Sequence, residues 1–200
     1  YKGINTFQFN NQHKTPISLV SGLNGFGKTS FVHALSWCLY GNLIAQVDEI
    51  YKKEIFSLGG YKKFLNSQMN RTVDSQSLSN EYYVEVVLDG VKLPGTMSNE
   101  VTIKRIFNTS STKETLNIEI DGVKNQLTQE IGYEEFINDY ILPREVAKFF
   151  FFDSEKIVDL ADIDREDNKR TLFSAYSKIL GLNAYLELTS TLENLIKRVS

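Results

Sequence analysis

Eight consecutive residues, Gly22 to Thr29, fill every fixed position of the phosphate-binding pattern G-x-x-x-x-G-K-[ST]. The glycines allow successive backbone N–H groups to turn inward around phosphate oxygens. The Lys28 ammonium reaches the β and γ phosphates, and the Thr29 hydroxyl is a ligand for Mg²⁺. The pattern therefore predicts a binding site for a nucleoside triphosphate and Mg²⁺.

The residues on either side of this loop have the order that phosphate binding needs. An apolar run at 16–21 predicts a buried strand, and apolar residues at helical spacing predict a helix that begins near Lys28 and ends at Gly41. The positive N-terminal end of that helix favours the same anion. Strand, loop and helix in this order favour nucleotide binding over a glycine-rich turn that has no ligand.

Composition restricts the classes of protein that the chain represents. Its 200 residues, 42% of them hydrophobic, are enough for one substantial domain or a domain with an appendage. The net charge is −3, so no overall basic balance indicates nucleic acid, and a DNA contact would need a local patch or another part of the protein. The basic pairs Lys52-Lys53, Lys62-Lys63 and Lys104-Arg105 are interpreted as solvated surface charge.

Location and redox state follow from what the sequence lacks. No apolar run approaches the roughly 20 residues that span a bilayer, and no signal-peptide pattern is present, so we expect a cytoplasmic protein without membrane contact. A single cysteine excludes an internal disulfide, and no Cys/His cluster has metal-ligand spacing. His33 and Cys38 on the predicted helix are interpreted as packed or solvent-facing side chains. Because the chain begins at Tyr1 and not at Met, we expect a fragment of a longer protein.

The middle of the chain predicts an antiparallel β meander, because β-branched and aromatic residues alternate between turn residues. Asp121-Gly122 predicts a hairpin turn. The polar run at 70–80 predicts a mobile surface insertion. The predicted strands are 4–9, 16–21, 82–88, 101–107, 116–120 and 123–127. The predicted helices are 30–40, a mixed stretch at 50–69, 128–140, and the chain from 168 onward.

The C-terminal segment carries a short heptad seam. Apolar side chains fall at spacings of three, four, three and four residues at Tyr185, Leu188, Leu192, Leu195 and Val199. This spacing predicts the beginning of a coiled coil. Two heptads are fewer than the three or four that identify one, so a helix packed on the domain is the alternative.

A second chemistry-bearing segment has four phenylalanines, 149–152, followed by Asp153, Ser154 and Glu155. In one interpretation a buried strand delivers an acidic pair to the nucleotide, as the hhhhDE motif does, although Ser154 separates the two carboxylates. In another, Asp153 lies at the junction with a helical region and senses Mg²⁺ and the γ-phosphate. In the third, a core strand or helix simply ends in a polar turn.

Several segments together resemble the N-terminal lobe of SMC-like ATPase heads, most closely the DndD family associated with DNA phosphorothioate modification. The resemblance is weakest over 42–130, and Ser154 replaces the usual glycine. It is carried by Tyr1–Gly3, the loop and helix through Leu39-Tyr40-Gly41, Tyr140–Pro143, Phe150–Ile157 and Ile179–Leu182.

The resemblance implies an α/β fold: a P-loop NTPase N-terminal lobe of the ABC/SMC type, with an antiparallel β meander and a C-terminal helix that leads into a coiled coil. It implies an ATPase lobe over 1–165 and a helical segment over 166–200. Lys28 and Asp153 would be catalytic, and Thr29 and Asp153 would hold Mg²⁺. The residues implied to contact ATP are Asn24, Gly25, Phe26, Gly27, Lys28, Thr29 and Ser30.

The implied activity is ATP hydrolysis between two heads of a homodimer, acting on DNA in phosphorothioate modification or a linked anti-phage defence complex with other proteins. The chain has no hhhhDE with adjacent acids and no signature motif. In this family both come from a second lobe, so we expect this part alone to hydrolyse ATP poorly. One alternative is an ATP-gated clamp on DNA or protein with little turnover. Another is a P-loop kinase or GTPase, although no lid, acceptor site or N-K-x-D motif is visible.

Overall fold

The computed structural model describes the chain in several stretches separated by gaps. Grouping of contacts divides the chain into two compact units, Tyr1–Glu134 and Glu135–Ser200, and each is described separately below. The described residues are 3–9, 18, 20–23, 25–47, 49–69, 80–93, 100–150, 173, 188–189 and 191–192.

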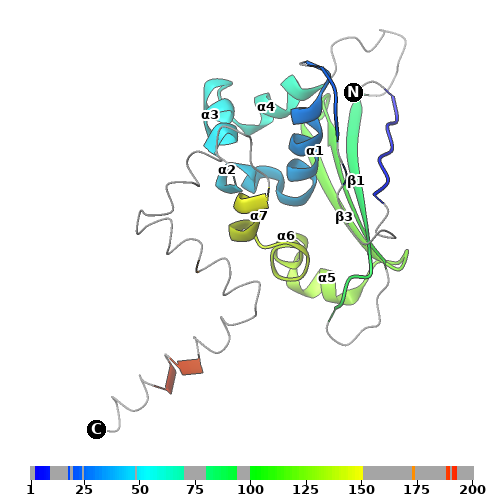
Figure 1. Ribbon diagram of the computed structural model, residues 1–200, viewed down its shortest axis with the longest axis vertical. Coiled ribbons are helices and arrows are strands. Elements are labelled where there is room, and N and C mark those ends of the chain that lie inside the picture. Colours follow the sequence, from blue (N-terminus) through cyan, green and yellow to red (C-terminus); the bar gives the residue numbers. More distant parts are fainter. Residues whose placement is uncertain are drawn as a thin grey trace. The chain divides into compact units, whose positions relative to one another are not determined.

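Along the described parts of the chain, helices α1–α4 come first, a three-stranded sheet follows, and helices α5–α7 come last (Figure 1). The helices are α1 (Lys28–Tyr40), α2 (Ile44–Val47), α3 (Glu49–Ser57), α4 (Tyr61–Gln68), α5 (Gln126–Ile131), α6 (Tyr133–Phe136) and α7 (Arg144–Phe150). The strands are β1 (Glu81–Asp89), β2 (Glu100–Asn108) and β3 (Lys113–Ile120). A 3₁₀ turn, Gly41–Leu43, follows α1, and a π-helical turn, Ile137–Ile141, follows α6.

The sheet is an antiparallel meander in the order β1-β2-β3, as the alternating pattern predicts. In the register of the strands, Phe107 of β2 lies opposite Tyr82 of β1 and Glu114 of β3. Because successive side chains point to opposite faces, Phe107, Arg105 and every second residue of β2 share one face. That face is buried along β2, whereas the residues between them are partly exposed.

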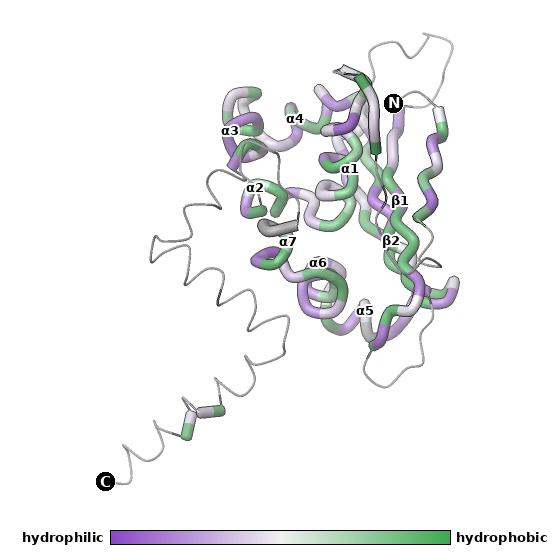
Figure 2. Tube along the Cα trace, viewed as in Figure 1, coloured by the Kyte–Doolittle hydropathy of each residue, from purple (hydrophilic) through white to green (hydrophobic). Residues whose placement is uncertain are grey.

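Helices α1–α4 pack with the buried face of the sheet. Helix α1 lies against β1 and β2 (Figure 1). A core cluster joins α1–α4 to the sheet, and Figure 2 shows hydrophobic residues along α1, β1 and β2. Its buried members are Trp37, Ile44, Tyr51, Phe64, Leu65 and Phe107. Their burial removes apolar surface from water and fixes α1 on the sheet.

Four described residues of the second unit are buried: Phe136, Ile137, Val146 and Ala147. The Phe136 ring lies 5.4 Å from the Tyr140 ring between centroids. Helix α7 begins after Pro143, and the Asn138 side-chain oxygen accepts a hydrogen bond from the Arg144 N–H at 3.2 Å. This bond satisfies one of the N–H groups that have no partner in the first turn of a helix. Phe149 and Phe150 belong to a helix, so they do not form the buried strand of the hhhhDE interpretation.

The structure corrects two predicted strands. Residues 4–9 have no regular secondary structure, and the rings of Phe7 and Phe9 instead lie 5.0 Å and 6.0 Å from the ring of Phe31. A strand needs a neighbour that shares its hydrogen bonds, and no described strand pairs with this segment. The predicted strand at 123–127 is reduced to a single bridge between Val123 and Ile120, because α5 begins at Gln126.

Predicted helices are interrupted where glycine takes a positive φ. The mixed stretch at 50–69 becomes α3 and α4, separated at Gly59 and Gly60, whose φ angles are 79° and 119°. The helix predicted at 128–140 is broken after α5 at Gly132, whose φ is 96°. In contrast, the predicted turn at Asp121-Gly122 is confirmed, since both residues have a positive φ and join β3 to Val123.

Several predictions lie wholly or mostly outside the described residues and stay predictions. They include the insertion at 70–80, the helix from 168 onward and its heptad seam, and most of the strand at 16–21, of which Ser18, Val20 and Ser21 have no regular secondary structure. None of the described helices is long and apolar enough to cross a membrane.

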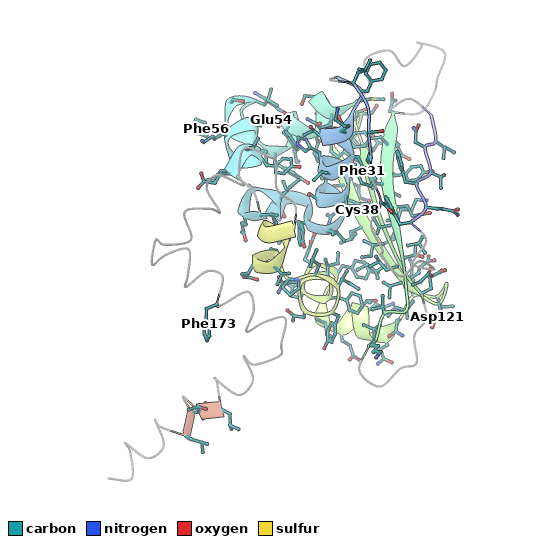
Figure 3. All side chains as sticks on the ribbon, in the orientation of Figure 1. Phe31, Cys38, Glu54, Phe56, Asp121 and Phe173 are labelled. Atoms are coloured by element: carbon teal, nitrogen blue, oxygen red, sulfur yellow. The ribbon has the colours of Figure 1, made fainter. Side chains whose placement is uncertain are left out.

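Replacing Phe107 by alanine tests the sheet–helix core. Phe107 is 1% exposed, so we expect Phe107→Ala to lower the free energy of unfolding by about 3–5 kcal/mol through lost burial and a cavity. Phe56, on the outer side of α3 (Figure 3) and 88% exposed, is the matched control, and Phe56→Ala should change that free energy by less than about 0.5 kcal/mol. Urea unfolding measures both; equal losses would contradict the core assignment.

Candidate functional site

The phosphate loop is shaped by two glycines in left-handed backbone conformation. Gly25 and Gly27 have φ angles of 84° and 86°, which a residue with a Cβ adopts at a cost of about 1–2 kcal/mol. Gly27 caps the N-terminal end of α1, and its carbonyl accepts the Phe31 N–H at 3.1 Å. The pattern of glycines in the sequence thus corresponds to the positions where the chain turns into the helix.

Lys28, the first residue of α1, folds back over the loop. Its ammonium donates hydrogen bonds to the Gly22 carbonyl at 2.6 Å and to the Leu23 carbonyl at 3.1 Å. The cation is therefore held on the loop by two neutral acceptors. Phosphate oxygens that carry negative charge form stronger bonds with an ammonium than carbonyls do, so they could replace either contact.

Thr29 and Ser30 occupy the first turn of α1, and both are exposed. The 13-residue helix presents backbone N–H groups without intrahelical partners at this end, where its dipole favours negative charge. The Thr29 hydroxyl is a hard oxygen ligand, which suits Mg²⁺ that is bound mainly by phosphates and water. Among the described residues, no group of three or more His, Cys, Asp or Glu could hold a metal by itself.

The structure brings most of the predicted nucleotide-binding residues together. Gly25, Phe26 and Gly27 form the turn, and Lys28, Thr29 and Ser30 begin α1. The Phe26 side chain is 71% exposed. The predicted contacts Asn24 and Asp153 lie outside the described residues. The roles assigned to all of these residues stay predictions.

The side chains of Cys38 and His33 on α1 pack against neighbouring elements, as expected. The Cys38 side chain is fully buried against the sheet (Figure 3), and its Sγ lies 3.4 Å from the Val84 carbonyl and 3.5 Å from the Ile103 carbonyl. Burial raises the pKa of the Cys38 thiol to about 12, so the thiolate does not form near neutral pH. The His33 ring contacts Tyr51, with ring centroids 4.6 Å apart.

The structure corrects the interpretation of Lys104-Arg105 as a solvated pair. Lys104 does lie on the outer face of the sheet, where it pairs with Glu85 at 2.8 Å and covers the Tyr83 ring. Arg105 points to the other face and is 2% exposed. The alternation of β2 could have revealed this, because Arg105 lies two residues from both Ile103 and Phe107 and so shares their face of the strand.

Arg105 binds the C-terminal end of α1. Its Nε donates to the Cys38 carbonyl at 3.0 Å and its Nη2 to the Leu39 carbonyl at 3.4 Å. These carbonyls belong to the last turn, where an α-helix leaves its C=O groups without intrahelical donors. The guanidinium also lies at the negative end of the helix dipole, where a cation is favourable.

Two carboxylates balance the buried charge of Arg105. Nη1 lies 3.2 Å from Glu114 Oε1, and Nη2 lies 3.1 Å and 3.3 Å from the two oxygens of Glu134. The pair with Glu134 thus uses both carboxylate oxygens, a geometry that an arginine fork favours. Since a buried cation without partners is costly, these carboxylates make the burial of Arg105 possible.

A hydrogen-bonded chain extends this network back to α1. The Trp37 indole N–H donates to the Tyr61 hydroxyl at 3.1 Å, and that hydroxyl donates to Glu114 Oε1 at 2.9 Å. Burial, with the neighbouring Glu114 carboxylate, raises the pKa of Tyr61, so its hydroxyl keeps the proton that it donates. Glu114 therefore receives hydrogen bonds from α4 and from β2.

Comparison with known protein families gives a match over nearly the whole chain. The family model described as an AAA domain matches residues 1–199. No curated protein and no solved structure matches the chain. The matched range includes the phosphate loop, all of α1 and the strand that carries Arg105.

Substitution of Gly41 tests how closely Arg105 packs at the end of α1. Gly41 has a φ of 51°, and an added Cβ would overlap the Arg105 guanidinium. We expect Gly41→Ala to lower the free energy of unfolding by more than about 2 kcal/mol. Gly90 also has a positive φ but nothing within 4 Å of an added Cβ, so Gly90→Ala should cost only about 1 kcal/mol. Equal costs in chemical denaturation would contradict the close contact.

The reactivity of Cys38 tests its burial. At about pH 8 an ordinary thiol is partly ionised and reacts with iodoacetamide. Because Cys38 is buried and its pKa is raised, we expect no alkylation of the folded protein and complete alkylation in guanidinium chloride. Mass spectrometry measures the label; rapid modification of the folded protein would show that α1 does not stay packed on the sheet.

Proposed function

This chain belongs to the AAA domain family of P-loop ATPases, and from that premise we propose that it is the N-terminal half of an SMC-like head that binds and hydrolyses ATP and acts on DNA. The observation that supports ATP binding most is the position of Lys28. Its ammonium lies over the loop carbonyls of Gly22 and Leu23 at the N-terminal end of α1, where phosphate oxygens can take their place.

The chain's own groups would stabilise the triphosphate in three ways. Lys28 would balance charge on the β and γ phosphates, and the backbone N–H groups of 24–29 would donate to phosphate oxygens as charge develops. Thr29 would hold Mg²⁺, with Asp153 proposed as a second ligand or γ-phosphate sensor. When bound, the metal neutralises phosphate charge during transfer to water.

The remaining parts of the proposal rest on the family resemblance. Segments such as Leu39–Gly41 and Tyr140–Pro143 resemble DndD-type ATPases, which supports a role in DNA phosphorothioate modification or a linked anti-phage defence complex in the cytoplasm. The acidic and signature motifs that complete hydrolysis would come from a second lobe and from a second head in a homodimer.

Replacing Lys28 tests the nucleotide site. Loss of a charge-assisted hydrogen bond removes about 1.5–3 kcal/mol of binding free energy, so Lys28→Ala should weaken ATP binding at least about tenfold and to below detection at micromolar nucleotide. Lys52→Ala, which removes an exposed lysine on α3, is the matched control and should bind like the unmodified chain. Isothermal titration with ATP and Mg²⁺ measures both, and unchanged affinity in Lys28→Ala would refute the site.

The full-length protein with DNA and its partner proteins separates the ATPase from the other candidates. Turnover well above the rate of Lys28→Ala would support the ATPase. ATP binding with turnover near background would favour an ATP-gated clamp. Equal affinity for GTP and ATP would instead favour another class of P-loop protein.

A further inference from the structure

We propose that Arg105 is a positioning residue for the phosphate site, acting through α1 and held in place by Glu134. This proposal rests on the proposed function only for the identity of the ligand, ATP. Its subject is how the helix that carries Lys28 and Thr29 is kept in position.

Helix α1 is held at both ends by cations. At its N-terminal end the Lys28 ammonium bonds the loop carbonyls, and at its C-terminal end Arg105 bonds the Cys38 and Leu39 carbonyls. A 13-residue α-helix is about 20 Å long and moves as a rigid rod. A shift at one end is therefore transmitted to the other.

The C-terminal end leaves little freedom for such a shift. Gly41, directly after α1, is buried so closely against the guanidinium that an added Cβ would overlap Arg105 Nη1. Arg105 itself is anchored in the middle of β2, the central strand. The end of α1 and the guanidinium must consequently move together.

Glu134 determines where the guanidinium sits. Arginine stays protonated in proteins, so its buried charge cannot be removed by loss of a proton. Glu114 is already engaged by Tyr61, whereas Glu134 meets Arg105 with both of its oxygens. Removing the charge of Glu134 leaves the guanidinium under-compensated and loosens its hold on the last turn of α1.

The contact between Arg105 and Glu134 is coupled to the affinity for triphosphate in this proposal. Triphosphate binding that shifts α1 at Lys28 would also change the strength of the contact between Arg105 and Glu134. Because such coupling is reciprocal, a change in the contact between Arg105 and Glu134 would then change the affinity for triphosphate by the same factor. Glu134 is the last residue of the first unit, and the second unit begins at the next residue.

The test uses Glu134→Gln, which keeps the size of the side chain and removes its charge. The Glu134 side chain is 34% exposed, so the variant is expected to fold. Its control is Glu135→Gln, a neighbouring exposed carboxylate with no hydrogen bond or ion pair among the described residues. Hydrogen exchange of the amides of 31–34, the first in α1 whose N–H groups have intrahelical acceptors, is compared without nucleotide in the two variants of the whole chain.

We expect faster exchange of the 31–34 amides, next to the phosphate loop, in Glu134→Gln and not in Glu135→Gln. A merely local structural role would speed exchange only near the end of α1 and lower the unfolding midpoint. Equal exchange of the 31–34 amides in the two variants would overturn the proposal, whatever ATP binding shows.

ATP binding by the unmodified chain decides the proposed function separately. If the unmodified chain binds ATP, Glu134→Gln should change the Kd for ATP about fivefold or more, and Glu135→Gln should leave it unchanged. An unchanged Kd in Glu134→Gln would also count against a positioning role for Arg105. If the unmodified chain binds no ATP but the 31–34 amides respond to Glu134→Gln, the positioning role of Arg105 is supported and the proposed function fails.

Discussion

A buried arginine at the end of the phosphate helix organises the first unit of this protein. Arg105 joins three elements at one point: the last carbonyls of α1, Glu114 on β3, and Glu134 on α6. A guanidinium can do this because its donors form a rigid planar fork, so one side chain satisfies carbonyls and carboxylates at once. The apolar core around Trp37 and Phe107 packs beside it and supplies the remaining stabilisation.

The position of this arginine explains why α1 is suited to carry a phosphate site. A helix that binds an anion at its N-terminal end is most favourable when its C-terminal end meets a cation, because both charges align with the helix dipole. Here Lys28 lies at one end and Arg105 at the other. The glycines at 25 and 27 provide the turn, and Gly41 allows the arginine to approach. Helix α1 is therefore packed on the sheet, while the residues at its N-terminal end are exposed to solvent.

Local patterns predicted the elements whose information lies in neighbouring residues. The phosphate loop, the helix after it, the three strands of the meander and the Asp121-Gly122 turn all follow from spacing, alternation or turn chemistry. The predictions failed where a distant partner or a glycine decided the outcome. Residues 4–9 have strand-like composition but no described strand beside them, and Gly59, Gly60 and Gly132 interrupt helical patterns by taking a positive φ.

Sequence alone was enough to predict a phosphate-binding loop with Lys28 and Thr29 at the start of a helix, because all fixed positions of the pattern lie in eight adjacent residues. The alternation along β2 places Lys104 and Arg105 on opposite faces, but it does not identify the partners that let Arg105 be buried. Only the tertiary structure decided that Lys104 meets Glu85 on the outer face while Arg105 is buried at the end of α1. The reason is physical: burial of a charge depends on carboxylates and carbonyls that are brought from other elements, and no local pattern records which of them arrive.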